Sequence, residues 1–113
     1  MVKFGVAVKA FIVNKGKLLI VKRSSDDPQR PGAWEIPGGR LDIGEDPKKG
    51  LIREVKEETE LDITVSYPLN IQHFTRKDGQ IITMITFFCK SKNRKVKINI
   101  HICSLLKFPQ EIW

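Results

Sequence analysis

Residues 39–61 constrain this chain more than any other part of it. Glu54, Glu57 and Glu58 stand at positions i, i+3 and i+4, so a helix there would carry all three carboxylates on one face. Like charges at this spacing destabilise an isolated helix by about 0.2–0.5 kcal/mol per pair, which makes function the first explanation for them. Clustered carboxylate oxygens suit hard divalent cations such as Mg²⁺. The segment therefore predicts a metal site, and the alternative is a solvated acidic helix face.

The sequence marks where this helix begins and which face it buries. Asp46 before Pro47 has the pattern of an N-cap followed by proline at the first helical position, where its missing N–H is harmless. The expected apolar face consists of Leu51, Ile52 and Val55. These side chains should hold the helix on a sheet while the carboxylates remain accessible.

Two positions in the same helix look unfavourable. We expect the helix to end near Thr59, where Glu60 would occupy a left-handed position that normally takes glycine, at a cost of about 1 kcal/mol. Gly50, inside the helix, predicts a second weakness of similar size. Both residues should lower the stability of the helix without changing the positions of the carboxylates.

The remainder of the chain is rich in strand-forming residues. We expect strands over 2–13, 17–23, 61–75 and 81–89 and a short one near 96–98, with tight turns at 14–16 and 77–79. Ser24 to Gly32 should form a loop. Strands on both sides of one helix predict an α+β domain with a mixed β-sheet and helical cover.

Composition limits the classes of partner. The chain has 113 residues, which predicts a single domain over 1–113, and it contains no apolar run of membrane-spanning length. Cys89 and Cys103 lack metal-binding or redox-motif spacing, so we expect reduced thiols and a cytoplasmic location. The net charge of +7 favours anionic partners such as phosphates, nucleotides or nucleic acid, and ordinary solubilising charge is the alternative. The oligomeric state stays open.

Residues 39–61 resemble the signature of the Nudix hydrolase family. That signature is Gly, five residues, Glu, seven residues, Arg-Glu, an aliphatic residue, any residue, Glu-Glu, any residue, Gly and an aliphatic residue. The positions in register are Gly39, Glu45, Arg53, Glu54, Val55, Glu57, Glu58 and Leu61. The one departure is Glu60, where the family usually has glycine. Residues 31–39 also resemble the usual lead into this segment, and the resemblance becomes weak after about Lys97.

The resemblance implies a fold and an activity. The fold would be an α/β/α sandwich with a mixed sheet and the loop and helix of the signature. The activity would be Mg²⁺-dependent hydrolysis of a pyrophosphate bond in a nucleoside diphosphate linked to another group. The compact size and the lead-in resemble the MutT-like enzymes, so a nucleoside triphosphate is the favoured substrate. The alternatives are a nucleotide-binding or regulatory domain with little catalysis, and an RNA-directed, decapping-like hydrolase.

The resemblance also assigns roles to residues. The implied ligands of Mg²⁺, with Mn²⁺ as the alternative, are the carboxylates of Glu54, Glu57 and Glu58 and the carbonyl of Gly38. Arg53 would orient Glu54, the best candidate within the segment for a general base, so that Glu54, Glu57 and Arg53 form the catalytic set. Glu45 would hold Arg53 or the start of the helix, and Gly39 would allow close approach of the backbone to metal and phosphate.

Substrate contacts are predicted outside the helix. Arg23, with Lys22 and Arg40 as lesser options, could bind phosphate, although a surface cation is the simpler interpretation of each. Trp34 is more often a packing anchor than a platform for a base.

The end of the chain departs from the family pattern. Residues 91–108 contain no glutamate or aspartate that could serve as a further base or ligand. His101 and residues 109–111 stand where related chains carry landmarks before a closing helix, and the chain ends at Trp113. We therefore expect that helix to be truncated, which keeps a weakly active or inactive copy open.

Overall fold

The computed structural model describes residues 3–14, 17–23, 25–26, 31–92 and 103–107. Its elements in chain order are β1 (Phe4–Asn14), β2 (Lys17–Lys22), β3 (Trp34–Glu35), β4 (Gly38–Arg40), α1 (Pro47–Thr59), β5 (Ile63–Thr75), β6 (Ile81–Ser91) and β7 (Cys103–Lys107). The four expected long strands and the helix are present. The expected turn at 14–16, the strand near 96–98 and the closing helix fall wholly or partly on residues outside the described ranges.

The strands form one mixed sheet of order β3-β2-β1-β6-β5, with β4 paired to β1 and β7 paired to β2. The central pair, β1 and β6, is parallel, from Phe4 opposite Ile81 to Ile12 opposite Cys89. The other pairs are antiparallel. The predicted α+β class with a mixed sheet is confirmed.

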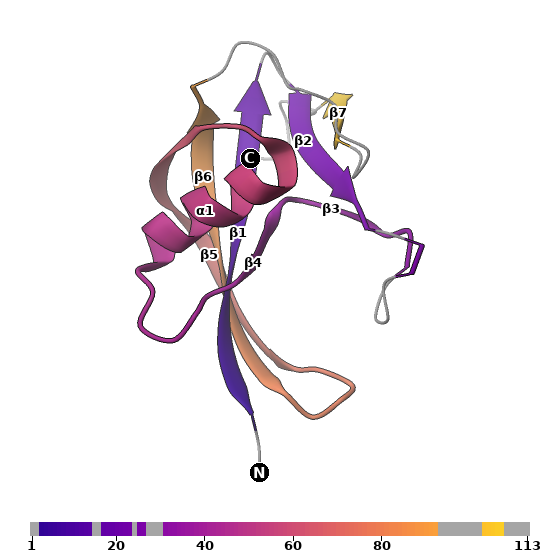
Figure 1. Cartoon of the computed structure of the whole chain (residues 1–113), viewed down its shortest axis with the longest axis vertical. Helices are drawn as coiled ribbons and strands as arrows, with labels where there is room; N and C mark the ends of the chain where they lie inside the picture. Colours follow the sequence, from indigo (N-terminus) through magenta and orange to yellow (C-terminus); the bar gives the residue numbers. More distant parts are fainter. Residues whose placement is uncertain (1–2, 15–16, 24, 27–30, 93–102, 108–113) are drawn as a thin grey trace.

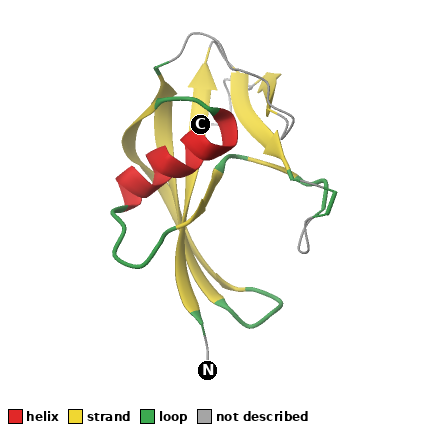
Figure 2. Ribbon diagram, viewed as in Figure 1, coloured by secondary structure: helices red, strands yellow, loops and turns green. Residues whose placement is uncertain are grey.

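The helix α1 lies across one face of the sheet, over β1 and β6 (Figure 1). The other ends of β1, β5 and β6 extend beyond it towards the N-terminus, as the strands below the helix in Figure 2 show. In the part of the chain that the structure describes, α1 is the only helix, so helical cover is described on one face alone. That helix is too short to span a membrane.

The core lies between α1 and this face of the sheet. Its buried members are Val8, Ala10, Ile12, Leu19, Val21, Leu51, Val55, Leu61, Ile63, Phe87 and Cys89. Alternate residues of β1 and β6 point into it, as expected for strands with one covered face. Cys89 is a free thiol, and burial raises its pKa to about 12, which makes it unreactive.

Both ends of α1 agree with the sequence. The Asp46 side chain accepts a hydrogen bond from the backbone N–H of Lys49 at 3.0 Å, and Pro47 follows it. At the other end Glu60 adopts a left-handed conformation, with φ 62° and ψ 9°, and its N–H donates to the carbonyl of Lys56. The expected left-handed conformation of Glu60 and the end of the helix at Thr59 are therefore confirmed.

One expectation inside the helix was wrong, and another overlooked a packing role. Ile52 is 40 % exposed, whereas Leu51 and Val55 are fully buried, so the apolar face is narrower than predicted. Gly50 is no simple weakness: it is buried, and a Cβ there would collide with Leu41 Cδ2 and lie 3.0 Å from Glu45 Cδ. The missing side chain is what lets the loop before α1 pack on the helix.

Candidate active site

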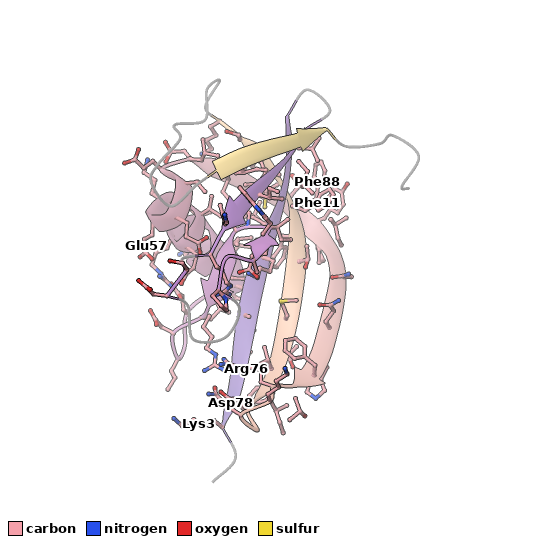
Figure 3. All side chains as sticks on the ribbon, turned by 90° about the vertical axis from the view of Figure 1, so that its right-hand side faces the viewer. Lys3, Phe11, Glu57, Arg76, Asp78 and Phe88 are labelled. Carbon is pink, nitrogen blue, oxygen red and sulfur yellow. The ribbon has the colours of Figure 1, made fainter. Side chains whose placement is uncertain are left out.

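The acidic side of α1 is positioned by its apolar side. Leu51 and Val55, one turn apart, are fully buried against the sheet. This leaves Glu54 and Glu58, also one turn apart, along the flank that meets Gly38 and Gly39 of β4. Glu57 lies further out, on the solvent side, where Figure 3 labels it.

Gly39 and Glu54 lie in direct contact. A Cβ on Gly39 would lie 2.5 Å from Glu54 Oε2 and 2.6 Å from its Cδ, so no larger residue fits there without moving the carboxylate. Burial raises the pKa of Glu54, and the charge of Arg53 opposes this shift. A carboxylate of raised pKa is a better proton acceptor at neutral pH than an exposed one.

Arg53 links the loop before the helix to the acidic face. Its Nε and Nη2 donate to the two oxygens of Glu45 at 2.7 and 2.9 Å. Its Nη1 lies 3.1 Å from Glu54 Oε1 and 3.2 Å from Glu57 Oε1. Glu45 also accepts the backbone N–H of Asp42, and these hydrogen bonds, that from Arg53 foremost, lower the pKa of Glu45 to about 2. The contacts expected of Arg53 with both glutamates are thus present.

Glu58 is the most enclosed of the three carboxylates. Burial raises its pKa to about 7, and the nearby charge of Glu54 adds to the shift. The charge of Lys9 and a hydrogen bond from the Gly38 backbone N–H act in the opposite direction. A buried carboxylate of this kind is stabilised by a proton or by a cation.

Lys9 and Glu35 belong to this site, and the sequence did not single them out. Lys9 is only 9 % exposed, and its Nζ lies 3.4 Å from Glu35 Oε1 and from the carbonyl of Ile36. Arg23 Nε lies 2.7 Å from the same Glu35 oxygen. A lysine at an alternating position of a β-strand looks solvent-facing from sequence alone, and only the pairing of β1 with β4 brings it here.

The side chains of this cluster are of the chemical type that hard divalent cations prefer, because they are mainly carboxylates. Carboxylates of Glu35, Glu45, Glu54, Glu57 and Glu58 outnumber the cations Lys9, Arg23 and Arg53 that neighbour them. Within the described ranges no three acidic, histidine or cysteine side chains are grouped closely enough to hold an ion as they stand. Glu57 is 58 % exposed and paired with Arg53, so its side chain has room to adopt another rotamer.

The remaining predicted contacts lie apart from this cluster or at its rim. Arg40 packs beside Gly5 and its Nη2 donates to Gln80 Oε1, so it does not face the carboxylates. Trp34 is about half exposed at the cross-strand position beside Lys22, whose ammonium lies 5.6 Å from the ring centroid. Arg23 reaches the cluster through Glu35.

Comparison with known proteins gives consistent matches. A family model described as the NUDIX domain matches residues 3–101. The protein Nucleoside triphosphatase NudI of Escherichia coli (strain K12) is 36% identical over 98 residues, which cover 78% of this chain and 70% of NudI. Nudix hydrolase 5 of Arabidopsis thaliana is 32% identical over 94 residues, covering 82% of this chain and 31% of that protein.

Solved structures share the fold. The crystal structure of a MutT protein from Methanosarcina mazei Go1 superimposes with a TM-score of 0.80 at 25% identity, over 95% of this chain and 78% of that one. The chain therefore spans most of these compact proteins but less than a third of the longer plant relative.

Proposed function

Because this chain belongs to the Nudix family, whose NUDIX domain model matches residues 3–101, we propose that it hydrolyses a pyrophosphate bond in a nucleoside diphosphate linked to another group. We propose a nucleoside triphosphate as the substrate and Mg²⁺ as the cofactor. The name of the E. coli relative, a nucleoside triphosphatase, supports the substrate. A cytoplasmic location is part of the proposal, because nucleotides are made there and Cys89 is a free thiol.

The observation that best supports the proposal is the packing of Glu54 and Glu58 against the backbone of Gly38 and Gly39. Glu54, Glu57, Glu58 and the Gly38 carbonyl would hold Mg²⁺. When bound, the ion neutralises phosphate charge and activates water. Gly39 keeps this place open, because a side chain there would push the Glu54 carboxylate away, whereas a side chain on Gly38 would collide with the backbone of Val8 and Lys9 in β1.

The residues around the ligands have separate tasks. Arg53 orients Glu54 and Glu57 through its Nη1 atom. Glu45 in turn holds Arg53 in place through two hydrogen bonds. Glu54 would accept a proton from an attacking water, a role that its raised pKa supports. Such supporting contacts typically matter by factors of about 10–100 in metal affinity or activity.

The proposal is tested by incubating the purified protein with a panel of nucleoside triphosphates, ADP-ribose and dinucleoside polyphosphates, with and without Mg²⁺. We expect Mg²⁺-dependent release of pyrophosphate and a nucleoside monophosphate from at least one triphosphate. Turnover confined to another member of the panel would contradict the substrate, and no turnover by folded protein would contradict the activity.

Two alternatives predict other outcomes, which binding measurements beside this assay would reveal. A nucleotide-binding domain with little catalysis is favoured by the lack of acidic residues in 91–108, and it would bind nucleotide without turnover. An RNA-directed hydrolase is favoured by the net charge of +7, and it would bind RNA with steep salt dependence.

A further inference from the structure

Lys9 is buried beside the proposed metal position. It lies in β1 between Val8 and Ala10, which are fully buried, and is itself only 9 % exposed. Lysine is almost never fully buried unless its ammonium is paired, because desolvating the charge is unfavourable. The contacts that Lys9 makes must therefore account for its position.

Those contacts are long. Lys9 Nζ lies 3.4 Å from Glu35 Oε1 and 3.4 Å from the carbonyl of Ile36, whereas N–H···O hydrogen bonds are normally about 2.7–3.2 Å. Arg23 Nε lies much closer to the same Glu35 oxygen, at 2.7 Å. Glu35 is therefore shared between Arg23 and Lys9, and both contacts of the Lys9 ammonium, which has three donors, are long.

Lys9 lies close to the segment that carries the proposed metal ligand Gly38. Glu35 and Ile36 run directly into Gly38, and a Cβ on Gly38 would lie 2.9 Å from Lys9 Cδ. The charge of Lys9 also acts on Glu58, one of the proposed metal ligands. Lys9 is therefore near both β3, through Glu35, and the proposed ligand Glu58 of α1.

We propose that Lys9 is a substrate-binding residue, which donates an N–H to a phosphoryl oxygen of the metal-bound diphosphate. This inference rests on the proposed function and adds to it a contact specific to this chain. The ammonium balances phosphate charge that the metal leaves uncompensated, so it favours diphosphates and triphosphates over monophosphates. A charge-assisted hydrogen bond in a dry site is among the stronger polar contacts.

The test separates contact with phosphate from support of the metal ligands. Calorimetric titration measures the affinity for Mg²⁺ alone, and then for imidodiphosphate, a diphosphate analogue, in saturating Mg²⁺. The proteins compared are wild type, Lys9→Met, Lys9→Arg and the control Lys3→Met. Lys3→Met removes the same charge from an exposed lysine at the far tip of the sheet, away from Glu57 (Figure 3).

We expect Lys9→Met to weaken imidodiphosphate binding at least tenfold without weakening Mg²⁺ binding. Lys9→Arg should recover much of the loss, and Lys3→Met should match wild type. If Lys9→Met does not fold, Lys9→Gln is measured with the same expected loss. Wild-type affinity in the neutral variant, or a loss explained wholly by weaker Mg²⁺ binding, would overturn the role of Lys9 while leaving the hydrolase proposal standing. Failure of wild type to bind Mg²⁺ and imidodiphosphate would overturn both.

Discussion

Arg53 and Glu45 are joined by two parallel hydrogen bonds, from Nε to Oε2 at 2.7 Å and from Nη2 to Oε1 at 2.9 Å. The pair connects the loop before α1 to the helix and leaves Nη1 of Arg53 for Glu54 and Glu57. The geometry of the acidic face therefore depends on a carboxylate that is not itself among the proposed ligands.

Replacing Glu45 should disturb the site without removing a ligand. Glu45→Gln cannot accept both hydrogen bonds, so we expect kcat/KM for the best nucleotide to fall by about 10–100-fold. Steady-state kinetics at saturating Mg²⁺ measures this. Asp62→Asn, which alters an exposed carboxylate paired with Lys56, is the control and should retain activity. Equal activity of Glu45→Gln and wild type would contradict the role of the pair.

Replacing Gly50 with alanine should destabilise the protein, which is the opposite of the usual effect of this substitution in a helix. Glycine to alanine normally stabilises a helix interior by about 1 kcal/mol. Here the new methyl group would collide with Leu41, so we expect Gly50→Ala to destabilise the protein by about 1–3 kcal/mol. Thermal unfolding measures this. The double variant Leu41→Ala with Gly50→Ala should lose less than the two single variants together, and an unchanged or raised Tm of Gly50→Ala would contradict the packing.

Replacing Glu60 with glycine should stabilise the protein. Its φ of 62° lies in the left-handed region, where glycine has no Cβ to strain. We expect Glu60→Gly to stabilise the protein by about 1 kcal/mol, which raises Tm by roughly 4–8 °C in a domain of this size. Glu60→Ala keeps the Cβ and serves as the control. A gain in Tm as large for alanine as for glycine would show that backbone strain is not the cause.

Glu58 should make the metal-free protein less stable as pH rises. Burial raises its pKa from 4.5 to about 7, so the native state holds this proton more tightly than the unfolded chain. Its contribution to the free energy of unfolding therefore decreases as pH rises from about 4.5 to 7 and is constant above that. In Glu58→Gln this decrease should be absent, and at pH 8 the variant should be more stable by up to about 3 kcal/mol.

Denaturant unfolding in EDTA between pH 5 and pH 8 measures this difference. Glu57→Gln, which retains Glu58, is the matched control and should keep the pH dependence of wild type. The same slope in Glu58→Gln as in wild type would contradict the assignment of the slope to Glu58.

The helix, its ends and the strands could be predicted from the sequence better than the tertiary contacts between them. Capping by Asp46 and Pro47 and the left-handed position of Glu60 follow from local backbone chemistry, and both are confirmed. The fold family was also predictable, because the spacing of the signature is specific, and the family match confirms it. The roles of the carboxylates stay predictions.

What the sequence did not reveal depends on tertiary contacts. Gly50 looked like a weakness because its neighbour Leu41 lies nine residues earlier, in a loop whose path has no periodic signal. The burial of Lys9 has no signal in the sequence, because the approach of Glu35 depends on how β1, β2 and β3 pair. Ile52 fitted an apolar stripe, but the sheet covers only the narrower face around Leu51 and Val55.

The carboxylates of α1 are proposed to hold a metal that supports pyrophosphate hydrolysis, and Glu57→Gln removes one of these ligands. The measurement is Mg²⁺-dependent pyrophosphate release from the best triphosphate by wild type, Glu57→Gln and Glu60→Gln. Glu60→Gln makes the same chemical change on an exposed glutamate three residues further along. We predict that only Glu57→Gln loses turnover, with Tm retained. Turnover by Glu57→Gln equal to that of wild type would contradict the account.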